Sequence, residues 1–109
     1  MPDFIANKVD AQFQGSGAGT NAGVTVTQNA PDAGELYVVY GIQCSGDAAA
    51  IVTVESPAAT VLYRKRFAAA FNMSEQFDAG VYGALGAAIL VKISASTAAC
   101  EANFQGARI

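Results

Sequence analysis

A long apolar stretch, residues 35–55, constrains the fold of this chain more than any other segment. Its sequence, ELYVVYGIQCSGDAAAIVTVE, contains two runs rich in β-branched, aromatic and small apolar residues. Both period-2 faces of the first run are largely apolar, so that strand must be covered on both sides. Ser45, Gly46 and Asp47 separate the runs and predict a tight turn, hence a buried hairpin. Since no segment has a helical pattern, the cover must be a second sheet or a neighbouring subunit.

The rest of the chain shows short alternating runs separated by turn residues. Besides the hairpin, strands are expected at residues 24–28, 60–67, 77–82, 87–94 and 100–106, with a loop at 72–75. About seven or eight short strands with almost no helix are typical of an antiparallel β-sandwich or jelly roll. We therefore expect an all-β sandwich domain over residues 24–109.

Residues 1–23 lack such a pattern and are expected to form an extended N-terminal arm and a linker. The segment GSGAGTNAG, residues 15–23, has the composition of a flexible linker. Apolar residues precede it and predict docking on the chain's own sandwich, a sister subunit or another partner; deleting residues 1–20 should then leave a folded β-protein. These expected partner-binding residues are Phe4, Ile5, Val9 and Phe13. The alternative is an ordinary first strand packed on its own domain.

Charged residues are scarce in this chain. They make up 14% of its 109 residues, and 52% are apolar, whereas about 25% is the usual charged fraction of soluble domains. So few charges leave part of the surface to be covered by other protein. Closed symmetry is the usual form of such assemblies, so we expect a homo-oligomer, and specifically a homotrimer. A weakly charged monomer is the alternative.

The charge and the apolar runs also disfavour two classes of partner. A net charge of −3 argues against nucleic acid, because phosphate binding needs an excess of Lys and Arg. The longest apolar run, residues 80–91, is too short to cross a bilayer, which predicts no membrane partner. The polar start of the chain lacks the pattern of a signal peptide. We therefore expect synthesis in the cytoplasm.

No catalytic or metal-binding constellation is recognisable. The chain has no histidine and only nine acids, which are scattered singly, so we expect no enzyme activity, no cofactor and no metal. Asp32, Glu35 and Asp47 lie in expected turns without forming a calcium-binding loop. Cys44 and Cys100 are expected as small buried hydrophobic residues in a reducing compartment, whereas a disulfide would require their strands to pair.

The basic triplet Arg64, Lys65 and Arg66 is the one cluster of positive charge. On a strand, only Arg64 and Arg66 share a face, about 7 Å apart. Two guanidinium groups at that spacing suit carboxylates on a neighbouring protein surface. Both are therefore candidate partner-binding residues, and a solvated outer strand face is the alternative.

Four segments in the order found here resemble a known family. They are YVVYGIQCSGDAAAIVTVES, TVLYRKRF, FDAGVYGALGAAILVKISA and the final NFQG. Between residues 35 and 106 the chain resembles the small jelly-roll proteins of tailed bacteriophages, in particular the capsid decoration (cement) proteins. The resemblance implies a homotrimer on the capsid exterior of the virion, bound to the major capsid protein lattice. It implies a role in stabilising the shell against DNA pressure, without enzymatic activity.

The resemblance extends to phage tail and fibre modules, which leaves a second function open. That function is a carbohydrate-binding β-sandwich module. Sugar-binding platforms need exposed aromatic rings, often including Trp. The chain has no Trp, and its Tyr residues lie mostly within expected strands. The sequence therefore favours the capsid role.

Overall fold

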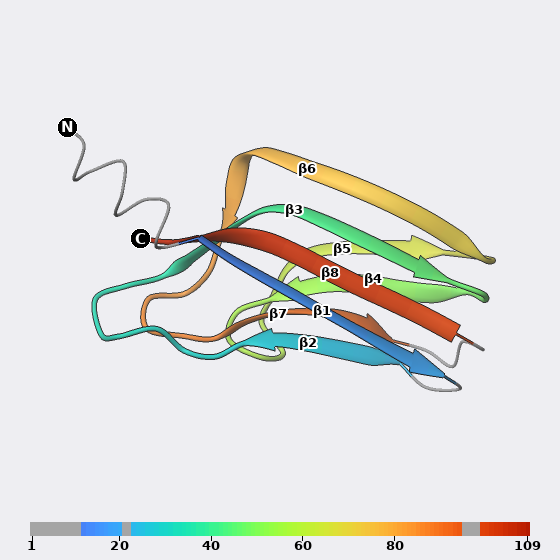
Figure 1. Cartoon of the computed structure of the whole chain (residues 1–109), viewed down its shortest axis with the longest axis horizontal. Helices are drawn as coiled ribbons and strands as arrows, with labels where there is room; N and C mark the ends of the chain where they lie inside the picture. Colours follow the sequence, from blue (N-terminus) through green and yellow to red (C-terminus); the bar gives the residue numbers. More distant parts are fainter. Residues whose placement is uncertain (1–11, 21–22, 95–98) are drawn as a thin grey trace.

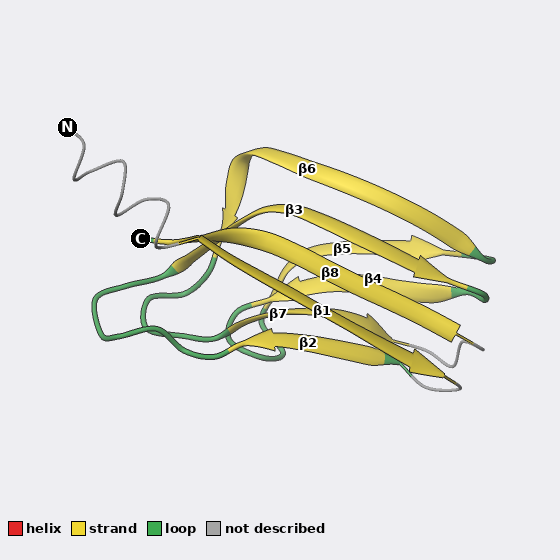
Figure 2. Ribbon diagram, viewed as in Figure 1, coloured by secondary structure: helices red, strands yellow, loops and turns green. Residues whose placement is uncertain are grey.

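The chain folds into two antiparallel four-stranded sheets packed face to face (Figures 1 and 2). The computed structural model describes residues 12–20, 23–94 and 99–109, apart from the side chains of residues 12 and 20. The strands are β1 (Gln12–Thr20), β2 (Val24–Gln28), β3 (Tyr37–Gly46), β4 (Ala50–Glu55), β5 (Val61–Phe67), β6 (Phe71–Tyr82), β7 (Ile89–Ser94) and β8 (Ala99–Arg108). Sheet A has the order β1-β8-β3-β6, and sheet B has the order β2-β7-β4-β5.

The connectivity is that of a jelly roll. Each strand is followed along the chain by a strand of the other sheet, with one exception. The exception is β5, which follows β4 in the same sheet and pairs with it. No strand pairs in parallel in either sheet, and the described residues contain no helix. The expected all-β sandwich is confirmed. The strand expected at residues 24–28 has the predicted bounds.

The core lies between the sheets and is built from the inward half of each strand. Most of its side chains are aliphatic, and its two buried aromatic rings are Phe104, which is 1% exposed, and Tyr37, which is 5% exposed. Its fully buried members include Val39, Ile42, Val52, Val54, Ile89, Val91, Ile93 and Phe104. Burial of each such side chain contributes about 1.5–3 kcal/mol. These residues come from both sheets, so neither sheet is stable without the other.

The two apolar runs of residues 35–55 are strands, as expected, but they do not form a hairpin. β3 pairs with β6 and β8 in sheet A, whereas β4 pairs with β5 and β7 in sheet B. The connection between them therefore crosses from one sheet to the other. The two strands pack face to face across the core and do not hydrogen-bond to each other as neighbours in one sheet. A hairpin and a pair of strands in different sheets both bury these apolar residues, so the local sequence pattern does not distinguish the two arrangements.

A β-bulge changes which residues of β3 face the core. The register with β8 shifts between Val39 and Gly41, so Tyr40 is the extra residue. Val39, Ile42 and Cys44 therefore share the inner face, although strict alternation would put Val39 opposite the other two. The outer face is not fully covered, because Tyr40 is exposed. Within this chain, the second cover expected for β3 is therefore incomplete, and cover by a neighbouring subunit stays a prediction.

The glycine-rich segment expected as a linker belongs to the sandwich. Residues 12–20 form β1, which pairs with β8 along its whole length. Phe13 packs edge-on against Tyr37 and Phe104, with ring centroids 5.0 and 5.4 Å away. The prediction of an arm and linker is therefore wrong for residues 12–20. Deletion of residues 1–20 would remove the whole of β1. Residues 1–11, with the rest of the expected arm, lie outside the described residues.

Glycine is required in β1 because the two sheets approach closely there. A Cβ atom on Gly15 would lie 2.6 Å from Cε1 of Phe104 and 3.1 Å from Cγ1 of Val26. A Cβ atom on Gly17 would lie 2.9 Å from the other methyl group of Val26. The alternating glycines therefore place bare backbone against the core, while Ser16 between them points outward.

The residues expected as a loop at 72–75 are part of β6. This strand pairs with β3 over Phe71–Gln76 and again at residues 81 and 82. Between these parts, residues 77–80 have no partner in β3, and Figure 1 shows the strand bending sharply near its end. Phe77 turns inward onto Tyr63, with 5.0 Å between ring centroids. Gly80 has a φ of +80°, which permits the bend.

We predict that Gly15→Ala destabilises the protein by about 1–3 kcal/mol, because the added methyl group overpacks the site beside Phe104. Ser16→Ala is the matched control, since Ser16 is exposed on the same strand, and its effect should stay within about 0.5 kcal/mol. Urea denaturation of both variants measures the difference. Equal stability of Gly15→Ala and wild type would show that β1 does not pack this closely in solution.

Candidate functional surfaces

Side chains that could bind a metal ion do not cluster in the described part of the chain. No group of three or more Cys, Asp or Glu side chains in this part of the chain is placed to hold a metal ion. Asp32, Glu35 and Asp47 therefore do not assemble a calcium site. No helix in this part of the chain is long and apolar enough to cross a membrane. The candidate sites are instead the outer faces of the two sheets.

The outer face of sheet B is positively charged. Thr53 on β4 pairs with Arg64 on β5 and with Lys92 on β7. Directly paired residues point to the same side, so Arg64 and Lys92 lie on one face, about 10 Å apart. Arg66 joins them two residues along β5, opposite Ile51. All three cations are exposed, and none has an ion pair among the described residues.

Lys65 lies on the other side of β5 from the two arginines. Its Nζ lies 5.6 Å from the centroid of the Phe67 ring, and Phe67 stacks on Phe71 across the gap between the sheets, at 4.2 Å. The alternation predicted for this triplet is therefore confirmed. The sequence did not identify Lys92 as a member of the same surface, because β4 separates the two strands.

One carboxylate, Glu55, is buried at the edge of this cationic face. It is 6% exposed and accepts hydrogen bonds from the N–H of Ala59 (2.7 Å) and the hydroxyl of Thr53 (2.8 Å). The bond from Ala59 is the main reason that the pKa of Glu55 lies below its ordinary value of 4.5; Thr53 and Lys92 lower it further, and burial opposes them. Glu55 thereby holds the β4–β5 turn, in which Ala59 has a φ of 75°.

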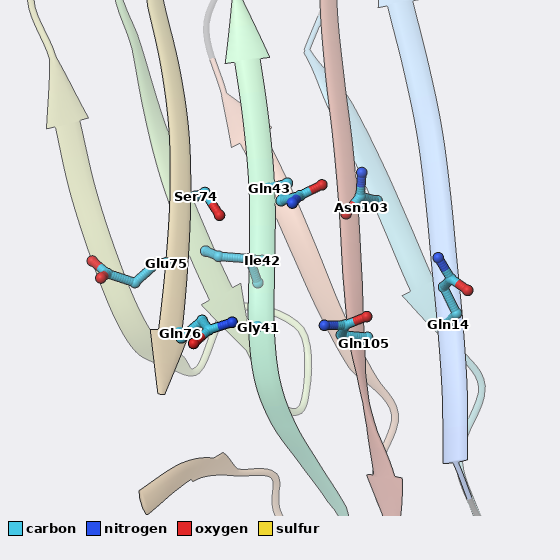
Figure 3. A pocket seen from close by; sticks show the side chains of 9 residues that line it. All are labelled: Gln14, Gly41, Ile42, Gln43, Ser74, Glu75, Gln76, Asn103 and Gln105. Carbon is cyan, nitrogen blue, oxygen red and sulfur yellow. The ribbon is translucent and has the colours of Figure 1, made fainter. Parts of the chain in front are cut away.

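The outer face of sheet A carries little charge and is rich in amides. Three rows of directly paired residues cross the sheet. From β1 to β6 they are Gln14, Gln105, Gly41 and Gln76; Ser16, Asn103, Gln43 and Ser74; and Ala18, Glu101, Ser45 and Asn72. The only charged member is Glu101. Figure 3 shows Gln76 and Gln105 reaching toward Gly41 from the two neighbouring strands, and Gln43 pointing toward Asn103.

A shallow hollow of about 120 Å³ lies on this amide face. Gly41 is at its centre, and the missing side chain leaves the space between Gln76 and Gln105 open. A Cβ atom there would still lie 3.4 Å from Nε2 of Gln105. The hollow therefore depends on a glycine at the bulge of β3.

The four tyrosines divide into two kinds. Tyr37 donates a hydrogen bond to the carbonyl of Asn29, and Tyr63 donates one to Oε1 of Glu75 at 3.1 Å. Burial, with the nearby Glu75, raises the pKa of Tyr63 to about 12. Tyr40 and Tyr82 are instead 41% and 55% exposed. Location within a strand was thus an insufficient reason to discount exposed aromatic rings.

The two cysteines lie on neighbouring strands of sheet A but are not joined by a disulfide. Cys44 pairs with Ala102, and Cys100 pairs with Gly46, so the two thiols are diagonal neighbours. Both are buried. Burial, followed by the influence of Cys100, raises the pKa of Cys44 to about 11. These features match the expectation of small buried hydrophobic residues.

The predicted partner-binding residues lie in different parts of the chain and do not form one surface. Arg64 and Arg66 lie together on the exposed face of sheet B. The Phe13 ring packs inside the chain's own fold, which is one of the docking alternatives that the sequence left open. Phe4, Ile5 and Val9 are beyond the described residues, so their role stays a prediction.

Comparisons with known proteins identify the fold and no family. Neither the protein-family models nor the curated proteins include a match to this chain. Among solved structures, the K1 cleaved adhesin domain of Lys-gingipain from Porphyromonas gingivalis W83 is similar, with a TM-score of 0.52 and 11% identity. The match covers 75% of this chain and 60% of the adhesin domain, so the chain spans less than two thirds of that domain's length. At this identity, the likeness shows the fold alone.

Two more distant likenesses have TM-scores too low to support an argument about function. The module CsCBM6-3 from Clostridium stercorarium, solved with cellobiose, has a TM-score of 0.46 and 14% identity, over 83% of this chain and 70% of that chain. The Tobacco streak virus coat protein has a TM-score of 0.43 and 10% identity, over 90% of this chain and 85% of that chain. Function must therefore be argued from the surfaces.

We predict that Glu55→Gln lowers stability by about 1–2 kcal/mol at pH 7, because a charged hydrogen-bond acceptor is lost. The lowered pKa means that the ionised Glu55 stabilises the fold above its ordinary value of 4.5. That contribution is lost as the pH falls through the still lower pKa of the folded state. The difference between variant and wild type should therefore shrink toward pH 3. Thermal melting from pH 3 to 7 measures it, with the exposed Glu101→Gln as control. A difference independent of pH would contradict this role.

Proposed function

We propose that the protein is a structural virion protein that decorates a bacteriophage capsid by binding the outer surface of the major capsid protein lattice. The observation that carries the proposal is the exposed cationic face of sheet B, formed by Arg64, Arg66 and Lys92. Its partner is then an acidic surface of the capsid. In this proposal, the protein is made in the host cytoplasm, lies on the virion exterior and has no enzymatic activity.

The charge distribution supports a protein partner for this face. Three cations gather on one sheet of a chain whose net charge is −3, and the nearest carboxylate, Glu55, is buried and already hydrogen-bonded. Arginine forks make paired hydrogen bonds with carboxylates. The β-strands hold the backbone of the three cations rigid, so the entropy lost on docking comes from their side chains and not from the chain that carries them.

A homotrimer is part of this proposal. β5 is an edge strand of sheet B, and Val61 and Leu62 near its start are 48% and 39% exposed. Edge strands with exposed apolar residues favour pairing with another chain. Contact between copies at this edge would cover apolar surface beside the cationic face.

We predict that light scattering of the purified protein at micromolar concentration gives a trimer mass, and that Leu62→Lys shifts the mass toward that of a monomer. Thr25→Lys, on the exposed opposite edge of the same sheet, adds the same charge and should leave the trimer intact. A monomer mass for the wild-type protein at this concentration would contradict self-assembly in solution.

A second candidate function is a phage tail or fibre module, or another carbohydrate-binding β-sandwich. The observation that favours it is the amide face of sheet A, with two exposed tyrosines nearby. This surface lies on the opposite side of the sandwich from the cationic face. The two functions therefore need not compete for the same residues.

We predict that the double substitution Arg64→Glu and Arg66→Glu weakens binding to capsids by at least about tenfold, because attraction becomes repulsion. Co-sedimentation with capsids that lack this protein measures binding, and wild-type binding should fall as salt is raised. Lys65→Glu is the matched control, since it changes an adjacent charge on the other side of β5. Equal loss in Lys65→Glu would contradict docking through this face.

The predicted arm residues are tested in the same assay. Replacing Phe4, Ile5 and Val9 together by Ala should weaken attachment if they bind the capsid, without unfolding the sandwich. Full binding by this variant would leave the cationic face as the attachment surface.

A further inference from the structure

The outer face of sheet A has unused hydrogen-bonding capacity. It carries six carboxamide side chains: Gln14, Gln43, Asn72, Gln76, Asn103 and Gln105. Within the described residues, none of these side chains forms a hydrogen bond. Each carboxamide offers two donors and an acceptor. Hydroxyl groups of Ser16 and Ser74 add further donors and acceptors to the middle row.

The chemistry of this face selects for an uncharged polar ligand. It has no cation to hold a phosphate or carboxylate, and its single acid, Glu101, is in the outermost row. Carboxamides and hydroxyls match vicinal sugar hydroxyls, which also donate and accept. An anionic polymer would leave its charges uncompensated here.

Two exposed aromatic rings, Tyr40 and Tyr82, lie at the bend of β6, next along β3 from the hollow. Tyr40 directly precedes Gly41, and its ring lies against Gly80 together with the ring of Tyr82. The Cβ position of Gly80 is 3.4 Å from Cε1 of Tyr40 and 3.5 Å from Cε1 of Tyr82. A substitution at Gly80 would also collide with Val38. The bend of β6 thus brings two exposed rings beside the amide rows, and ring faces suit the apolar C–H faces of sugars.

We propose that the outer face of sheet A binds a neutral oligosaccharide, with one sugar in the hollow at Gly41 and another against Tyr40 or Tyr82. Gln76 and Gln105 reach the hollow from either side, while Gln43 and Asn103 hold the next unit (Figure 3). Four strands span about 14 Å, so the ligand is a short chain of sugars and not a monosaccharide.

This site rests on the second candidate function, for which it specifies the ligand class and the residues, and it does not rest on the proposed capsid role. The two sheets pack face to face, so a molecule docked through sheet B presents sheet A to solution (Figure 1). A decoration protein would then display a glycan-binding surface outward. The experiment uses the isolated chain without capsids, so its failure leaves the docking proposal intact.

The test is titration of the full-length, ¹⁵N-labelled protein with neutral hexasaccharides, namely cellohexaose, laminarihexaose, xylohexaose, maltohexaose and mannohexaose. Polygalacturonate is the charged comparator. We expect at least one neutral hexasaccharide to shift the side-chain amide signals of Gln43, Gln76, Asn103 and Gln105. No shift with any of them at millimolar concentration, or shifts with polygalacturonate alone, would overturn the proposal.

Substitutions identify the surface. Gln43→Ala, Gln105→Ala and Tyr40→Ala should each weaken binding at least tenfold, whereas Thr25→Ala on sheet B should not change it. All four positions are exposed, so the fold should persist, and thermal melting checks this. Unchanged affinity in all three sheet A variants would overturn the assignment. If the side-chain amide signals shift with protein concentration in the absence of sugar, the sugar-binding assignment would also be overturned. The occupant of the face would then be a second copy of the chain.

Discussion

The packing of the Phe104 ring against bare backbone closes the sandwich. Phe104 lies on β8, between β1 and β3 in sheet A, and its ring lies against the backbone of Gly15. Val26 of sheet B meets Gly15 and Gly17 from the other side. This contact brings the edges of the two sheets together, so the valines of β2 are buried although their strand is at an edge. Without it, the core would be open along one side.

The local pattern was sufficient for most strands but not for their partners. Alternation at residues 24–28 reflects one buried and one exposed face, and at residues 60–67 it reflects a half-buried inner side with Tyr63 and Phe67 opposite an exposed outer side. The pairing of β3 with β6 and β8, instead of β4, depends on segments far apart in the chain. Residues 35–55 bury the same apolar groups in either arrangement, so their sequence does not decide between them. Long-range register is a property of the whole core.

The other differences between the predicted and the observed strands arise where one residue type can serve two structural roles. Glycine is frequent in linkers because it is flexible, yet Gly15 and Gly17 are used for their small size. The bulge at Tyr40 reverses the faces of β3, and a bulge has no reliable signal in an apolar run. β6 was divided because Asn72 and Ser74 resemble turn residues, although both are outward members of a strand.

The candidate surfaces were only partly predictable for the same reason. Arg64 and Arg66 are neighbours on one strand, so alternation alone places them together. Lys92 joins them only through the pairing of β4 with both β5 and β7. The amide face is assembled from four strands, and each contributes one or two unremarkable carboxamide residues. No single segment carries its signature.

The two faces have different chemistry because the fold constrains only the inward half of each strand. Inward positions must fill the core, whereas outward positions need only be compatible with a strand. The exposed polar residues on the outer side of sheet B are mainly cations and threonines, and those on the outer side of sheet A are mainly amides and serines. Nothing in the packing of the core requires this separation of charge from amide. The two proposed recognition surfaces, one for an acidic protein and one for an uncharged polar ligand, would account for it.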